Sequence, residues 1–461
     1  MVTFILRRSV MAIFVISGSF AFIYGLAATI GDPLAEIRLS NPENLEYLLL
    51  AATRELRLDQ SIPERFFGWY SDVIRSILNG EFTLGTSLSG RPVSEGLLGA
   101  VAPTFWLVII SIIFSLLLGA ILGMFVAIRR QGFREPLIGL LLFLGYVSPV
   151  FWISHLIKQY LVVILNDRAI ETITWYTLLA PLFGSLIFLL AITFFFLAQY
   201  SINEKLARKR FAISLLFAIP MMAVANSLLP NETRVIFVAL NAFLAITFWL
   251  AFWIFVGRGM PNKAKFGIRF GILWVFSVLI QKLISVFPNY MQRDEIAGRP
   301  FPSFAYESVW YSPPEFWILQ LDRVLHLLLP ALAITITTTA IYYQVTKNAA
   351  IEALESDYVR MARAKGINEL EVLVRHVFRS CYLSLINTFV PNYLYLFNGV
   401  IIVELVFGWQ GIGVYLLSSM FSYDLNRLMG GIFVIGLLTF VAMVGSDLLM
   451  SRVDARIRAF K

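Results

Sequence analysis

The chain has 461 residues, of which 59% are hydrophobic and 14% charged, and its mean hydropathy is +0.77. This composition excludes an ordinary soluble globular protein and indicates a membrane protein. The formal net charge of +8 then needs no nucleic-acid partner, because loops rich in Lys and Arg on one membrane face account for it.

The predicted elements begin with a transmembrane helix in residues 1–31. Two arginines precede an uncharged run of 22 residues, which is longer than the roughly 7–15-residue apolar core of a signal peptide. We therefore expect a retained span with a cytoplasmic N-terminus. Residues 32–99 are the largest polar segment and should lie outside, and the spacing of Phe67, Tyr70 and Ile74 predicts a short amphipathic helix within it.

Apolar runs near the roughly 20 residues that a helix needs to cross a bilayer recur through the rest of the chain. Residues 100–165 hold two, residues 166–319 hold four followed by an outer segment, and residues 320–461 hold three, which predicts ten spans in total. Lys and Arg collect in alternate loops, so the positive-inside rule places both termini in the cytoplasm. This is an all-α integral membrane protein, a polytopic helical bundle.

The four runs in residues 166–319 have distinctive features. Cations predict cytoplasmic exposure of residues 200–210 and 257–269, with residues 230–234 outside. Ionisable residues are absent from the middle of the runs, so we expect these spans at the periphery, away from any solute path. The bulky apolar residues expected to face lipid in the first run are Phe183, Phe188, Phe194, Phe195 and Phe196.

The longest polar interruption in the C-terminal half is residues 347–381. Its apolar residues at steps of three and four are Ile351, Leu354, Tyr358 and Met361. This spacing predicts a helix with these side chains on one face. Gly366 is placed to end that helix, and Asn368 with Glu371 predicts a capping box that starts a second one. From charge alone, a solvated basic loop between two spans is the simpler interpretation.

Motifs for catalysis are missing from the sequence. There is no Gly-Lys dipeptide, hence no P-loop for ATP phosphates, and there is no nucleophile elbow or paired His/Glu metal spacing. The single cysteine, Cys381, excludes an intrachain disulfide. We expect no catalytic residue, no cofactor and no metal site on this chain.

A family resemblance begins in the polar loop. The stretch that carries it reads DYVRMARAKG and consists of Asp357, Tyr358, Val359, Arg360, Met361, Ala362, Arg363, Ala364, Lys365 and Gly366. It resembles the D-Y-V-R-x-A-R-A-K-G pattern in the cytoplasmic loop of permease subunits of oligopeptide/dipeptide-type ABC importers. The family's R-H-x-x-R-N follows here as RHVFRS in residues 375–380, with Ser380 in place of Asn.

Further matches follow in the family's order. They are GDP at residues 31–33, LGTSL and GRPV at 84–93, Pro103-Thr104, Val403-Glu404, FGWQGIG at 407–413 and DARI at 454–457. The main departure is residues 166–319, because the family usually has six spans and little sequence at this place. Ala455 also replaces a proline that is usual there.

The resemblance implies a six-span type I importer core with about four extra spans, in the bacterial inner membrane. It implies a non-enzymatic permease that forms half of a translocation pathway. Peptides are the substrates that we expect, and nickel chelates or sugars are the alternatives within the family. The implied partners are a second homologous permease, two ATPase subunits that bind ATP and Mg²⁺, an extracytoplasmic binding protein and membrane lipid. The loop of residues 347–381 would couple this chain to an ATPase, and its docking residues would be Asp357, Tyr358, Arg360, Met361, Ala362, Arg363, Ala364, Lys365 and Gly366. The alternatives are a self-sufficient secondary transporter or a structural membrane protein.

Polar residues in the span after the loop are candidates for lining the path. They are Asn387, Asn392, Asn398 and Glu404. Polar groups at membrane depth face a cavity or a neighbouring helix, so hydrogen bonding between helices is the alternative for the asparagines. Glu404 lies near the outer end of its span, where simple hydration is the alternative.

Overall fold

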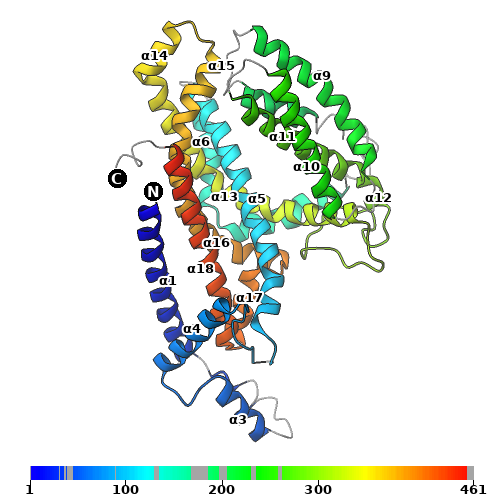
Figure 1. Ribbon diagram of the computed structural model, residues 1–461. Helices are drawn as coiled ribbons and strands as arrows, with labels where there is room; N and C mark the ends of the chain where they lie inside the picture. Colours follow the sequence, from blue (N-terminus) through cyan, green and yellow to red (C-terminus); the bar gives the residue numbers. More distant parts are fainter. Residues whose placement is uncertain are drawn as a thin grey trace.

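In a computed structural model, the protein is built mainly from α-helices (Figure 1). Residues 2–453 are described, apart from 31, 36–37, 39–44, 89, 129–133, 168–184, 197–204, 230–234 and 258–261. Up to the inserted region, the helices are α1 (Val2–Ile30), α3 (Leu45–Glu55), α4 (Ile62–Leu78), α5 (Val93–Ile128), α6 (Arg134–Val147), α7 (Val150–Leu156) and the π-helix η1 (Ile157–Leu161). The later ones are α9 (Lys205–Leu228), α10 (Val235–Val256), α11 (Lys263–Ser285), α12 (Phe287–Met291), α13 (Phe316–Glu355), α14 (Asp357–Ala364), α15 (Glu369–Val372), the π-helix η2 (Leu373–Val377), α16 (Phe378–Phe407), α17 (Ile412–Phe421) and α18 (Leu425–Val453).

The protein is a multi-pass membrane protein, as its sequence predicts. Within the described residues, seven helices are long and apolar enough to cross a membrane, or up to nine if each of two bent pairs counts as one span. A shorter apolar helix, Ser185–Phe196, lies in the first of the four extra runs. The total of ten spans and the orientation of the termini stay predictions.

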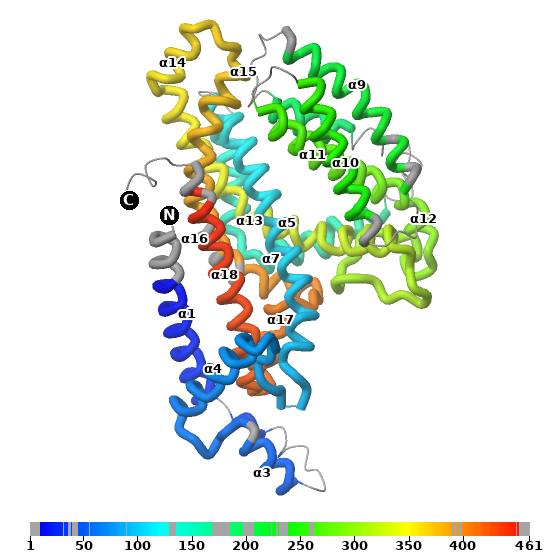
Figure 2. The backbone as a smooth tube through the Cα atoms, in the orientation of Figure 1, coloured from blue at the N-terminus to red at the C-terminus, as the bar shows by residue number. Residues whose placement is uncertain are grey.

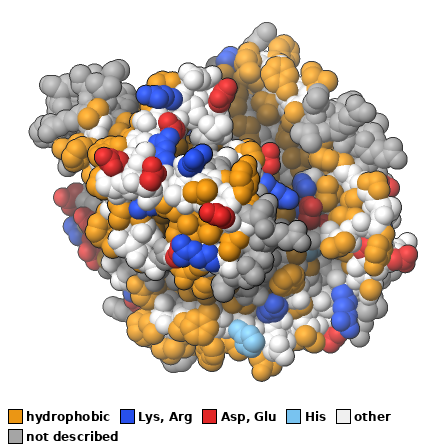
Figure 3. Space-filling model, turned by 90° about the horizontal axis from the view of Figure 1, so that it is seen from below, with side chains coloured by type: hydrophobic (Ala, Val, Ile, Leu, Met, Phe, Trp, Pro, Cys, Tyr) orange, Lys and Arg blue, Asp and Glu red, His pale blue; other side chains and the backbone are white. Residues whose placement is uncertain are grey.

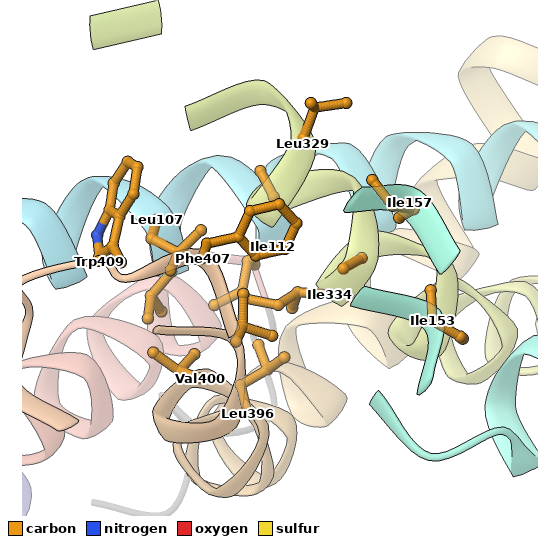
Figure 4. Packing of buried hydrophobic residues seen from close by; sticks show 14 of the residues in the cluster. Leu107, Ile112, Ile153, Ile157, Leu329, Ile334, Leu396, Val400, Phe407 and Trp409 are labelled. Atoms are coloured by element: carbon orange, nitrogen blue, oxygen red, sulfur yellow. The ribbon is translucent and has the colours of Figure 1, made fainter. Parts of the chain in front are cut away.

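The central bundle is built on α13, which packs along α5 and against α16. Small residues bring α5 and α13 together: a Cβ on Gly119 would lie 2.6 Å from the Cβ of Tyr342, so no larger residue fits there. Farther along, the hydroxyls of Ser115 and Thr338 lie 2.5 Å apart. Apolar side chains from α5, α7, α13 and α16 pack into one cluster, which Phe407 and Trp409 complete (Figure 4).

Two sharp bends change the expected paths of the chain. The second span predicted in residues 100–165 is broken at Ser148-Pro149, where α6 and α7 meet at 104°. Proline disfavours helical geometry in the residue before it, which explains the break. The span after residue 381 also ends in a bend of 86°, and the short apolar helix α17 follows, where the sequence indicated only a glycine-rich outer loop.

The inserted helices form a core of their own beside the bundle (Figures 1 and 2). Trp249 and Trp253 of α10 and Phe266 and Phe270 of α11 are fully buried in it. Phe188 is also fully buried, with its ring 5.1 Å from that of Phe270, and Phe196 is 3% exposed. The expectation that these two phenylalanines face lipid is therefore wrong, because they fill the interior of the inserted region instead. Phe183 lies outside the described residues.

The remaining phenylalanines of that run have other neighbours. The ring of Phe194 stands edge-on to Phe378 at the start of α16, with 5.3 Å between centroids, so this helix reaches the central bundle. Phe195 packs partly buried against the aromatic core of the insert. The phenylalanine side chains of this run therefore mostly contact aromatic side chains of neighbouring helices, where the sequence predicted contact with lipid.

The amphipathic helix predicted in residues 32–99 is α4, but it buries a different face. Phe66, Trp69 and Val73 pack against the bundle, whereas Phe67 and Ile74 are 67% and 42% exposed. Capping by Ser61 and Glu64 fixes where α4 begins. Seen from below relative to Figure 1, the surface mixes acidic, basic and apolar side chains (Figure 3).

Thiol labelling tests the orientation of the insert. Lys209 of α9 and Lys265 of α11 are exposed and belong to the cation-rich residues 200–210 and 257–269. Lys209→Cys and Lys265→Cys should therefore react with an impermeant maleimide only from the cytoplasmic side. Tyr311→Cys, at a position 87% exposed, should react only from outside. All three variants are made in a protein that carries Cys381→Ser, which replaces the buried native thiol. Labelling of Lys209→Cys and Lys265→Cys from opposite faces would contradict a pair of complete crossings between them. Residues 230–234 lie outside the described residues.

Candidate functional site

The loop between α13 and α16 forms two short helices, α14 and α15, joined by a glycine turn. These helices lie at one end of the bundle and α17 at the other (Figure 1); we call these the α14 end and the α17 end. Gly366 has φ +73°, and its N–H donates to the Arg363 carbonyl at 2.9 Å. The Ile367 N–H donates to the Ala362 carbonyl at 3.3 Å, which completes a Schellman motif. The predicted helix, glycine turn and second helix are confirmed.

The details at the ends of this loop differ partly from expectation. Ser356 is extended, with ψ 150°, so the predicted single face from Ile351 to Met361 is divided between α13 and α14. Asn368 caps α15 by accepting the Leu370 N–H at 3.0 Å, as predicted. Glu371, expected to complete a capping box, is 2% exposed and binds Arg375 at 2.8 Å.

The helix α14 has an inner and an outer face. Val359 and Ala362 are buried against Ala353 of α13 and Val372 of α15. Of the predicted docking residues, Ala362 therefore belongs to the inner face, where it holds the helix in place. The outer residues are Asp357, Tyr358, Arg360, Met361, Arg363, Ala364, Lys365 and Gly366, all exposed. This is a rigid helix that presents both apolar and cationic side chains outward.

An ion pair braces the glycine turn. The guanidinium of Arg363 donates twice to Glu369, Nη2 at 2.6 Å and Nε at 3.1 Å, which ties the end of α14 to the start of α15. Both side chains are about half exposed, so the pair adds little stability, but its two-pronged geometry fixes the angle between the helices. Arg360 lies 3.7 Å from Asp357 and keeps 70% of its side chain exposed.

A buried carboxyl group organises the α17 end. Glu404 of α16 has no exposed surface, and its Oε1 accepts the Thr104 hydroxyl of α5 at 2.5 Å. Its Oε2 accepts the N–H groups of Gly413 and Val414 at 2.8 and 3.1 Å. The Thr104 oxygen in turn accepts the Ile412 N–H at 2.8 Å. Glu404 and Thr104 thus satisfy the first turn of α17, whose N–H groups have no partner within the helix.

Two glycines make this arrangement possible. A Cβ on Gly411 would collide with the Glu404 carboxyl and the Thr104 hydroxyl, and one on Gly413 would lie 2.7 Å from Glu404 Oε2. The GxG spacing of residues 411–413 therefore serves the approach of a carboxyl group to the helix backbone. The alternative of simple hydration does not hold for Glu404, because the folded chain encloses it between α5, α16 and α17.

The family comparison gives a direct result for these segments. Residues 210–459, over half of the chain, match the model of the family described as binding-protein-dependent transport system inner membrane component. The chain belongs to this family. The matched region includes the α14–α15 pair, Glu404 and the glycines of the α17 turn. It begins at residue 210, within residues 166–319, where the chain departs from the peptide-permease pattern.

The individual relatives of this chain are peptide permeases. The chain is 34% identical to a peptide permease protein of Brucella ovis over 137 residues, and these residues make up 30% of this chain and 43% of the relative. It is 30% identical over 138 residues to the dipeptide transport system permease protein DppB of Escherichia coli, 30% of this chain and 41% of DppB. It is 29% identical over 137 residues to the oligopeptide transport system permease protein OppB of Mycobacterium tuberculosis, 30% of this chain and 42% of OppB. The chain thus spans less than half of the length of each.

The candidate path residues of this transport protein do not converge on one surface. Asn387 is exposed and lines a 560 Å³ cavity with residues of α1 and α18, among them Ile16 and Ser446. Asn392 is 7% exposed and lies beside Tyr342 of α13. The five-residue step between them turns the helix by about 140°, which explains the separation. The side chain of Asn398 lies outside the described residues.

Sequence reasoning missed Thr104 and the helix α17 as parts of this site. The Pro103-Thr104 motif marked Thr104 in the sequence. No local pattern, however, connects Thr104 with Glu404, which lies 300 positions later. Within the described residues, no group of three or more His, Cys, Asp or Glu could hold a metal ion.

Proposed function

We propose that this protein is a permease subunit of an ATP-driven, binding-protein-dependent importer whose substrates are peptides. It forms half of the translocation pathway with a second, homologous permease. Two separate ATPase subunits bind ATP and Mg²⁺, and one of them docks on the α14–α15 pair of this chain from the cytoplasm. An extracytoplasmic protein delivers the substrate. The family supports the transport role, and the similarity to peptide permeases supports the choice of peptides.

The observation that carries the docking assignment is the division of α14 into two faces. Its inner face is used by the fold, whereas Tyr358 and Met361 are 43% and 56% exposed beside exposed cationic side chains. An apolar anchor surrounded by charges is the usual composition of a protein-binding patch. The Schellman turn and the Arg363–Glu369 pair hold this patch rigid, so it can transmit a push from a bound partner.

Reconstitution tests the proposal as a whole. The complex is isolated from cells that produce this chain with its neighbouring transport subunits, and is placed in liposomes loaded with ATP. We expect accumulation of a labelled peptide only when the binding protein, the ATPases and ATP are all present. Uptake without the ATPases would instead indicate a secondary transporter.

A charge placed on the exposed face of α14 should block ATPase binding. Met361→Asp puts a carboxylate where an apolar anchor is expected, and it should weaken binding about ten- to a hundredfold. The matched control is Phe421→Asp at the opposite end of the bundle, where the side chain is 82% exposed. Equal binding by both variants, measured by co-purification and by titration of the ATPase onto detergent-solubilised permease, would exclude α14 as the docking helix.

A further inference from the structure

Residues 301–309, which we call the strap, lie across the turn between α16 and α17. The Ala305 N–H donates to the Phe407 carbonyl, the last residue of α16, at 2.8 Å. The ring of Tyr306 stands edge-on to Trp409, with centroids 5.1 Å apart. Phe304 covers Gly408 so closely that a Cβ there would collide with its ring. Three consecutive residues of the strap thus contact three consecutive residues of the turn.

Both ends of the strap are fastened to other helices. At one end, Asn166 pairs with the backbone of Phe301 in both directions, accepting its N–H at 2.8 Å and donating to its carbonyl at 3.0 Å. At the other end, Ser308 donates to Asp322 of α13 from its N–H at 2.9 Å and from its hydroxyl at 2.7 Å. Asp322 is fully buried, and it also accepts the Tyr290 hydroxyl at 2.9 Å.

The strap is held in a costly backbone conformation where it meets the turn. Ala305 has φ +69°, in the left-handed region, which residues with a Cβ adopt only at a cost in free energy. Such a conformation persists only where the surroundings impose it, and here both neighbours of Ala305 pack on the turn. The strap is therefore a fixed connection and differs from an ordinary surface loop.

One helix joins the strap to the α14–α15 pair. Arg323 of α13 donates to Glu307 of the strap at 3.0 Å and lies over the Tyr306 ring, 5.7 Å from its centroid. From Arg323, α13 continues to Glu355, two residues before Asp357 begins α14, and this stretch is about 48 Å long at the rise of an α-helix. A displacement of α14 thus reaches the strap through one continuous element.

We propose that the strap links α13 to the α16–α17 turn, so that movement of the docked α14 is passed to the turn at the far end of the bundle. This assignment rests on the proposed transport function. It gives residues 301–309, which belong to the segment joining the extra spans to the core, a direct part in positioning the turn that Glu404 supports. Loss of the strap should uncouple ATP hydrolysis from transport without preventing either ATPase docking or assembly.

The decisive comparison uses two substitutions of Ala305. Ala305→Pro removes the N–H that binds Phe407 and forces φ near −65°, so it should release the strap. Ala305→Gly keeps the N–H and accepts a positive φ freely. We expect the peptide transported per ATP hydrolysed to fall about tenfold in Ala305→Pro and to stay within about twofold of the parent in Ala305→Gly. Equal ratios in the two variants would overturn the proposal.

A second set of variants removes the side-chain contacts and guards against misfolding. Tyr306→Ala loses the contacts with Trp409 and Arg323 and should lower the same ratio, whereas Tyr306→Phe keeps the ring and should restore it. Tyr311→Ala, at a side chain 87% exposed, is the matched control. If Tyr306→Ala fails to assemble, Ser308→Ala decides, and an unchanged ratio there overturns the proposal. If the parent complex shows no ATP-dependent uptake, the proposed function itself fails, which is a different outcome.

Discussion

Replacing Gly366 by valine should reduce ATP-driven uptake at least about tenfold while leaving the protein in the membrane. Gly366 has φ +73°, and a left-handed conformation costs a residue with a Cβ about 1–2 kcal/mol, more when the side chain is β-branched. Because no atom lies within 4 Å of a Cβ built there, the effect would come from the backbone and not from a clash. The turn would open, and α14 would lose its fixed angle to α15.

The matched control is Gly366→Asn. Asparagine enters the left-handed region more readily than other residues with a side chain. This variant should therefore keep most of the uptake, although it also adds a side chain at this position. Uptake and ATP hydrolysis are measured on the same reconstituted complex, with membrane insertion checked by fractionation. Normal transport by Gly366→Val in a correctly inserted complex would show that this turn does not couple the ATPase to the spans.

The elements that follow from neighbouring residues could be predicted well. Gly366 and Asn368 mark the end of one helix and the start of the next, because capping depends on a few adjacent residues. Long apolar runs such as α5 and α18 are equally local signals. The exposed face of α14 could be foreseen only partly. Helical spacing grouped Tyr358 and Met361 correctly, but the break at Ser356 separates them from Ile351.

The contacts between distant segments could not be predicted from local patterns. Glu404 appeared as one polar residue near the end of a span, because its three partners come from α5 and from a helix that was too short to be recognised. Phe188 and Phe196 were assigned to lipid because an apolar surface in a membrane protein suits a lipid and a neighbouring helix equally well. Only the packing of α10 and α11 decides between them.

Removal of the Glu404 carboxyl group should destabilise the α17 end more than any other single change discussed for that region. Glu404→Ala leaves the Gly413 and Val414 N–H groups and the Thr104 hydroxyl without their acceptor in a site closed to water. Each buried donor that loses its partner costs about 1–3 kcal/mol, so the loss of stability for three donors should be at least about 3 kcal/mol. The thermal transition of the detergent-solubilised protein should therefore move down by several degrees, and uptake should be lost.

Two further variants separate hydrogen bonding from mere size or charge. Glu404→Gln keeps the volume and one acceptor oxygen, so it should fall between the parent and Glu404→Ala, at about 1–2 kcal/mol. Glu95→Ala removes an exposed carboxyl group from the same end of α5 and should change stability by less than about 0.5 kcal/mol. If the thermal transitions of Glu404→Ala and Glu95→Ala coincide, the carboxyl group does not hold the first turn of α17. If stability falls but uptake remains normal, the α17 turn is structural and plays no part in transport. If Glu404→Gln loses uptake at nearly full stability, the α16–α17 turn takes part in the conformational change of transport. A small weakening of the hydrogen bonds to residue 404 would then be enough to interrupt the transmission from α14.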